Sequence, residues 1–85
     1  MGDPEHDRLN LAMERDHLAA AEKDLAEGGQ RIAKQAALLD RLRRDGRDTA
    51  QAESFLRTLE QTLLIWRDHR DEILRAIARL EEKLA

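Results

Sequence analysis

A carboxylate and an imidazole stand at Glu14 and His17, a spacing that puts both side chains on one face of a helix. In di-iron bundles, several such pairs on neighbouring helices hold the metal ions. Here the one counterpart is the reversed pair His69 and Glu72, and His6 has no partner set recognisable by spacing. We therefore expect no metal ligands and no cofactor, and a metal-binding bundle is only the third of our hypotheses.

A cluster of arginines lies near the middle of the chain, at Arg41, Arg43, Arg44 and Arg47. Guanidinium groups bind phosphate and carboxylate oxygens, so this cluster is a candidate contact for an anion or an acidic partner. Three nearby acids dilute the charge, namely Asp40, Asp45 and Asp48. Arginines at the end of a helix also stabilise that helix, and a nucleic-acid module would usually add a wider basic face or stacking aromatic residues. Nucleic-acid binding is therefore not the favoured prediction.

Catalysis has little support in the residue types. No nucleophile stands beside a base, no glycine-rich phosphate loop follows a strand, and no carboxylate pair belongs to an evident cleft. Thr49 and Ser54 read as helix-start residues, and the absence of cysteine excludes thiolate chemistry and disulfides. We expect a protein that is not an enzyme and has no catalytic or cofactor-binding residues.

The elements that position these side chains follow from the apolar pattern. In the first half, apolar residues recur every seven positions, at Leu11, Leu18, Leu25, Ile32 and Leu39. In the second half a four-three spacing runs through Ala52, Leu56, Leu59, Leu63, Trp66, Arg70, Ile73, Ile77, Leu80 and Leu84. Such spacing is typical of helices that pack along an apolar seam, and leucine, alanine, arginine and glutamate favour helix. The sequence predicts an all-α fold of two long antiparallel helices, a coiled-coil-like helical hairpin.

Capping signals give the expected boundaries of one domain over residues 1–85. Asp3 suits the N-cap and Pro4 the first helical position, and Gly46 can adopt the left-handed conformation that ends a helix. Asp48 is the best cap for the second helix, with Gln51 as the partner of a capping box. We expect helix one over about 4–44, a turn over 45–48 and helix two over about 49–84. At about 1.5 Å per residue the rod is roughly 60 Å long.

Two glycines, Gly28 and Gly29, interrupt the first predicted helix and cost roughly 2 kcal/mol against alanine. Because Leu25 and Ile32 keep their heptad phase across the pair, we expect a continuous helix. Gly28, like Ala21 one heptad earlier, then falls in the second seam position. It would admit a close helix or a large side chain such as Trp66, the alternative being a merely tolerated glycine.

Arg70 occupies a seam position where an apolar residue is expected. Its guanidinium would either pair with an acid of the first helix, such as Glu14, or extend to the surface along its own aliphatic stem. Both readings stay open at this point.

The second helix carries more apolar surface than one seam can cover. Phe55, Leu64, Ile65 and Leu74 lie beside the main stripe, and a second copy of the hairpin would cover them in a four-helix bundle. We expect a homodimer whose interface centres on Leu25, Ile32, Leu59, Leu63, Trp66 and Ile73. The leading hypothesis is a structural or protein-interaction module that presents charged faces to an unidentified protein partner. The alternative is a small regulator that binds nucleic acid or a phosphate-rich ligand through the arginines.

Charge and hydropathy indicate where the protein works. Charged residues make up 39% of the chain with a formal net charge of −3, so no global field draws it to nucleic acid or anionic lipid. No apolar run reaches the roughly 18 to 20 residues that span a bilayer, and the start Met1–Glu5 is unlike a signal peptide. We expect a soluble cytoplasmic protein without membrane contact.

The stretches Leu42–Ala50, Phe55–Leu63 and His69–Asp71, with Leu18–Glu22 and Gly29–Ala33 upstream, form a recognisable signature. In these segments the chain resembles small uncharacterised helical proteins of alphaproteobacteria such as rhizobia, most sharply at the Asp-Gly-x-Asp-Thr turn of Asp45–Thr49. The resemblance covers the chain from about His17 onward. It implies a bacterial cytosolic hairpin and brings no activity and no catalytic residues with it.

Overall fold

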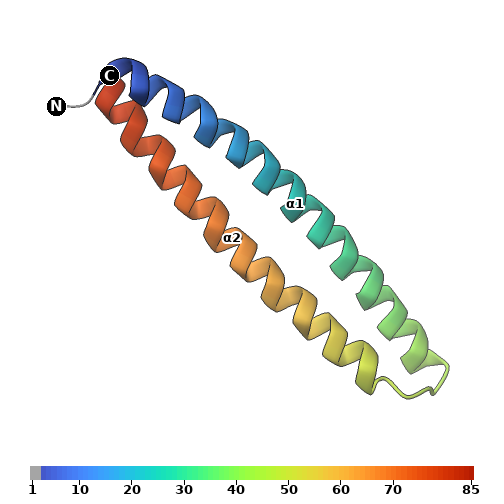
Figure 1. Ribbon diagram of the computed structural model, residues 1–85. Coiled ribbons are helices and arrows are strands. Elements are labelled where there is room, and N and C mark those ends of the chain that lie inside the picture. The colour runs from blue at the N-terminus through green and yellow to red at the C-terminus, as the bar shows by residue number, and fades with distance from the viewer. Residues whose placement is uncertain (1–2) are drawn as a thin grey trace.

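The computed structural model describes residues 3–85 and contains two helices, α1 (Pro4–Arg44) and α2 (Ala50–Leu84). The helices lie side by side in opposite directions, so the two chain ends meet at one end and the turn at the other (Figure 1). The Cα atoms extend over 64 × 15 × 15 Å, close to the expected rod length. The predicted all-α helical hairpin is confirmed. The expectation of no signal peptide draws partly on Met1 and Gly2, which lie outside the described residues.

Helix α1 begins as the residue types predict. The side chain of Asp3 accepts a hydrogen bond from the Glu5 backbone N–H at 3.0 Å, and Pro4 stands at the first helical position. Glu5 and Asp7 place negative charge in the first turn, where the positive end of the helix dipole favours it.

The end of α1 is a Schellman motif, in which a left-handed residue after the helix closes the last carbonyls. Gly46 has φ +65°, its N–H donates to the Arg43 carbonyl at 3.2 Å, and the Arg47 N–H donates to the Leu42 carbonyl at 2.9 Å. Gly46 therefore ends the helix by adopting the left-handed conformation, as predicted.

The start of α2 differs by one residue from the prediction. Asp48 Oδ1 accepts from the Ala50 N–H at 3.0 Å, but Thr49 occupies the cap position. The Thr49 hydroxyl bonds to the Glu53 carboxylate at 3.2 Å, and no bond from Gln51 forms a capping box within residues 3–85. The predicted capping box is wrong because Asp48 lies one position before the N-cap. Gln51 is then only the second residue of the helix, whereas the partner in a capping box is the third.

The double glycine does not break α1, which runs without interruption from Pro4 to Arg44. A Cβ added to Gly28 would lie 3.1 Å from Leu63 Cδ1, whereas one added to Gly29 would meet nothing within 4 Å. The prediction of a continuous helix is confirmed. Gly28 receives a large side chain from α2, and that side chain is Leu63.

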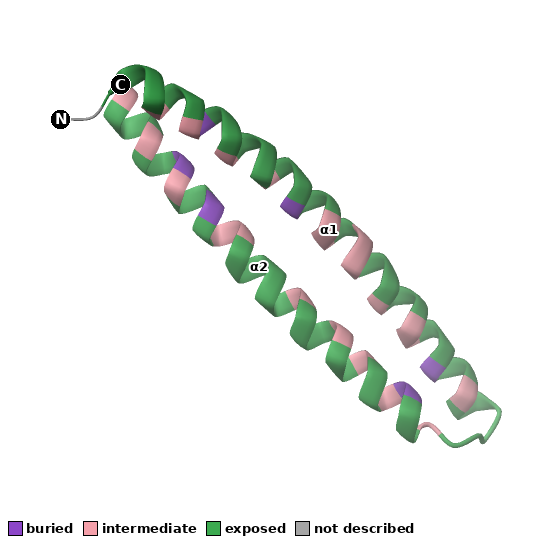
Figure 2. Cartoon of the chain, viewed as in Figure 1, coloured by how far each residue is buried: buried purple, intermediate pink, exposed green. Residues whose placement is uncertain are grey.

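The core is small and lies toward the two ends of the rod. The buried residues are Leu11, Ala21, Leu39, Ala52, Ile73 and Ile77. Four of them form a cluster near the chain ends against Leu18, Leu80 and Leu84, and the other two, Leu39 and Ala52, lie near the turn. No residue of α2 between Ala52 and Ile73 is buried, as the green and pink middle of that helix shows (Figure 2). The middle of the hairpin is thus the part whose apolar side chains remain open to solvent.

Neither α1 nor α2, across the described residues, contains a stretch apolar and long enough to cross a membrane.

Candidate functional site

Most of the predicted interface residues lie in the seam between α1 and α2. Ile73 is buried, and Leu25, Ile32, Leu59 and Leu63 are half-buried. Trp66 is exposed to 38%. One partner helix therefore covers these side chains only in part, and the seam stays open along one side.

Three hollows follow that open side, and together they define what we call the groove flank. The first has a volume of about 360 Å³ and is lined by His17, Ala20, Ala21, Asp24, Ile65, Trp66 and His69. The second, of about 290 Å³, is lined by Asp24, Glu27, Gly28, Arg31, Thr62, Leu63 and Trp66. Because both include Asp24 and Trp66, they are parts of one groove over the middle of the hairpin.

The third hollow lies near the turn, has a volume of about 390 Å³ and is lined by Gln35, Leu38, Leu42, Asp48, Gln51, Ala52 and Phe55. Gln35 crosses the seam here, since its side-chain amide donates to the Ala52 carbonyl at 3.1 Å. Exposed apolar residues also stand along the groove flank: Ile65 at 68%, Phe55 at 54% and Leu38 at 38%. This flank combines hollows with uncovered apolar side chains.

Two ion pairs between the helices cross the opposite flank of the hairpin. Arg15 Nη2 lies 3.7 Å from Glu81 Oε2 near the chain ends, and Arg43 Nη2 lies 3.2 Å from Glu53 Oε1 near the turn. Leu64 and Leu74 are exposed but line none of the three hollows. The two flanks therefore differ in that the three hollows lie on one and the two interhelical ion pairs on the other.

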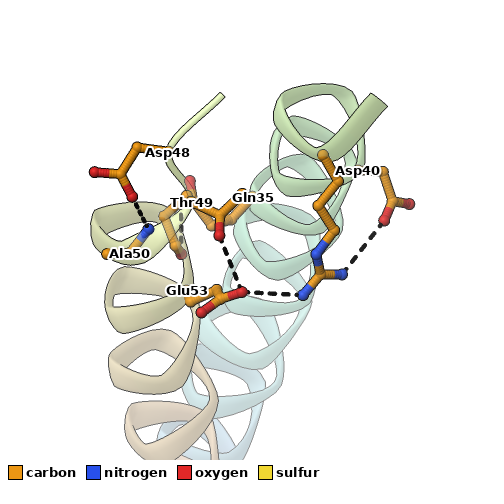
Figure 3. A network of polar contacts seen from close by, with 8 residues as sticks. Gln35, Asp40, Asp48, Thr49, Ala50 and Glu53 are labelled. Atoms are coloured by element: carbon orange, nitrogen blue, oxygen red, sulfur yellow. Dashed lines mark hydrogen bonds and ion pairs between the residues drawn. The ribbon is translucent and has the colours of Figure 1, made fainter. Parts of the chain in front are cut away.

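The arginine cluster lies at the turn, where all four guanidinium-bearing residues are exposed. Only Arg43 is held, by Glu53 and by Asp40 at 4.0 Å (Figure 3). Within residues 3–85, Arg41, Arg44 and Arg47 form no ion pair. In this cluster Arg43 therefore links α1 to α2, and the other three arginines make no ion pair within residues 3–85.

Arg70 does not pair with Glu14. Its Nε and Nη2 both donate to Asp71 Oδ1, at 3.2 and 3.1 Å, and its side chain is about one third exposed. Glu14 instead lies 3.7 Å from His17 on its own helix. Of the two readings left open, the structure therefore has Arg70 extending toward the surface, where the adjacent Asp71 pairs with it.

The described residues do not gather chemistry-bearing side chains elsewhere. Across residues 3–85, no three histidine or acidic side chains come close enough to hold a metal ion. Arg75 bonds to Glu72 one turn earlier, and this hydrogen bond raises the pKa of Arg75 above its ordinary value. Arg75 thus remains a cation that is bound within its own helix.

Sequence reasoning missed the charged residues that line the groove on α1, namely Asp24, Glu27 and Arg31. A signal was available, since they recur at three- and four-residue intervals directly beside the apolar seam.

No protein-family model, curated protein or solved structure matches the chain. The resemblance to alphaproteobacterial hairpin proteins therefore stays a prediction, as do the bacterial origin and the cytoplasmic location.

Proposed function

We propose that this protein is a helical interaction module that associates with a second copy of itself into a four-helix bundle. The observation that carries this proposal is the uncovered middle of the hairpin. There the seam residues of α2 are at best half-buried, while Ile65, Phe55 and Trp66 expose much of their surface beside open hollows. Burying apolar surface contributes about 25 cal/mol per Å², so a second helical pair along the groove would gain appreciable free energy.

The first test is the solution mass by sedimentation equilibrium over a concentration series. We expect a species of twice the 9.8 kDa chain mass. A mass equal to one chain at every concentration would overturn the proposal and leave a different helical protein as the occupant of the groove.

A variant tests whether self-association uses the open side of the seam. Ile65→Asp places a charge where self-association would bury it, so we expect monomers with undiminished helical circular dichroism. Gln61→Asp is the control, because Gln61 is exposed and lines none of the hollows. The sequence also predicts that Leu63→Asp abolishes association, but Leu63 packs on Gly28 and this change would disturb the hairpin itself.

The second candidate function is binding of nucleic acid or a phosphate-rich ligand at the turn. The exposure of Arg41, Arg44 and Arg47 without intramolecular ion pairs among the described residues favours it, and the neighbouring aspartates weigh against it. Retention on DNA or RNA at low salt that is lost in an Arg44→Ala, Arg47→Ala variant would support this role. Absence of retention by the unaltered protein would end it.

A further inference from the structure

The charges of α1 on the groove flank change sign at the middle of the helix. Asp24 and Glu27 are followed by Arg31, and Lys34 stands one heptad after Glu27 on the same flank. Gly29 lies midway between Glu27 and Arg31 and also midway between Asp24 and Lys34. A strip with this symmetry is complementary to a copy of itself turned end for end, because each acid then faces a base.

These four charges are available for such pairing. None of the ion pairs within residues 3–85 involves Asp24, Glu27, Arg31 or Lys34. The two acids are half-buried beside the groove and the two bases are exposed. Exposed ion pairs contribute only about 0.2–1 kcal/mol each, so their main effect is to choose the orientation of the partner.

Two residues at the hollows are also related by the rotation about Gly29. Gly29 is midway between Ala20 and Leu38, and Ala20 lines the first hollow whereas Leu38 projects beside the third. The rotation that pairs the charges therefore places the exposed Leu38 of one copy over the small Ala20 of the other. A large side chain facing a small one is the arrangement that packed helices favour.

On α2, two residues that line hollows are related by the same rotation, here centred on Thr62. Leu63 contacts the position of Gly28, so its neighbour Thr62 lies level with the centre of the α1 strip. Thr62 is midway between Phe55, which lines the third hollow, and His69, which lines the first. The rotation therefore brings Phe55 of one copy onto the first hollow of the other, beside Leu38.

The threonine hydroxyls at the centre of this surface need no hydrogen-bond acceptor from a second copy. The hydroxyl of Thr62 donates to the Thr58 carbonyl at 2.9 Å, and that of Thr58 donates to the Ser54 carbonyl at 3.2 Å. Since both hydroxyls are bonded within their own helix, a second copy can cover them without leaving an unsatisfied donor.

We infer that the two copies pack through their groove flanks with their turns at opposite ends. Leu38 and Phe55 of each copy enter the hollow lined by Ala20, Trp66 and His69 of the other, and the α1 strips pair acid to base. This inference rests on the proposed self-association and adds its face and orientation. With both turns at the same end, Arg31 and Lys34 would instead face the partner's α2 between Phe55 and Thr62, where the groove flank offers no acid.

Two charge-reversal variants test the orientation by sedimentation equilibrium. The variant Asp24→Lys, Glu27→Lys has an all-basic strip, and Arg31→Glu, Lys34→Glu has an all-acidic strip. Each alone should associate about tenfold more weakly than the unaltered chain, a change of about 1.4 kcal/mol. An equimolar mixture of the two should recover association, because a turned copy then pairs every lysine or arginine with an acid.

Controls with the same net charge change act away from the groove. Glu22→Lys, Glu60→Lys and Arg57→Glu, Arg67→Glu alter exposed residues that line none of the three hollows. We expect each control to associate as the unaltered chain does. If the chain is a dimer and both strip variants keep its affinity, the orientation is refuted while self-association stands. If the unaltered chain is monomeric, both proposals fail.

Discussion

Single residues on α1 show how closely the two helices approach. Gly28 and Gly29 are neighbours in one helix, yet one faces Leu63 and the other faces open space. Because glycine in a helix interior is less favourable than alanine by about 1 kcal/mol, Gly29→Ala should raise the free energy of unfolding by about that amount. Urea denaturation followed by circular dichroism measures the change.

Gly28→Ala is the matched variant. Its new methyl group would lie 3.1 Å from Leu63 Cδ1, so the leucine must move to admit it and part of the gain in helix propensity is lost. We expect a clearly smaller stabilisation than for Gly29→Ala. Equal stabilisation by the two variants would contradict the close approach of the helices at Gly28.

Burial separates two isoleucines of α2. Ile73 is 5% exposed within the cluster near the chain ends, whereas Ile65 is the most exposed of the large apolar residues. Truncating a buried isoleucine to alanine costs about 2–5 kcal/mol, so Ile73→Ala should lower the free energy of unfolding by an amount near the lower end of that range in so thin a core. At concentrations low enough to dissociate the proposed dimer, Ile65→Ala should leave the free energy of unfolding nearly unchanged.

At the scale of elements, the turn depends on one backbone conformation. Gly46 has φ +65°, and a side chain there would meet no neighbouring atom, so only the backbone penalises substitution. Gly46→Ala should destabilise the hairpin by about 1 kcal/mol, and Gly46→Asn by less, because asparagine tolerates the left-handed region. Thermal melts of the three proteins would test this order. A fully stable alanine variant would mean that the Schellman motif contributes nothing to the fold.

Both ends of α1 and its continuity were predictable from the sequence because they depend on local chemistry, whereas the cap of α2 was misplaced by one residue. Asp3, Pro4 and Gly46 act within a few residues of themselves, and the heptad phase from Leu25 to Ile32 carries α1 through its glycines. The pairing of Arg70 was not predictable in this way. Both Asp71 and a residue across the seam satisfied the same chemical rule, and only the three-dimensional arrangement selects between them.

The groove flank was likewise only partly visible in the sequence. Excess apolar residues such as Phe55 and Ile65 could be recognised from their positions beside the stripe. The ion pairs that Arg15 and Arg43 make across the opposite flank were not predictable, because long side chains find such partners only once the register of the two helices is fixed. The register, in which Leu63 lies against Gly28, is a property of the folded pair of helices.

For the whole molecule, the proposed self-association would link stability to protein concentration. A partner that binds only the folded chain stabilises it by mass action, so the midpoint of thermal unfolding should rise with concentration. The same series on Ile65→Asp should give a constant midpoint. A constant midpoint for the unaltered chain as well would mean that the hairpin folds and works as a single copy.

The rod shape has a consequence for how the protein moves through solution. Its Cα radius of gyration is 19.1 Å, against about 12 Å for a compact domain of this length. An elongated particle experiences more friction than a sphere of equal mass, so a single hairpin should elute early in gel filtration and appear heavier than 9.8 kDa. The turned pairing proposed above is centred on Gly29, five residues past the middle of α1, so it would offset the two copies by about ten residues, or about 15 Å at about 1.5 Å per residue. The pair would therefore stay elongated, and it should elute earlier than a globular protein of twice the 9.8 kDa chain mass.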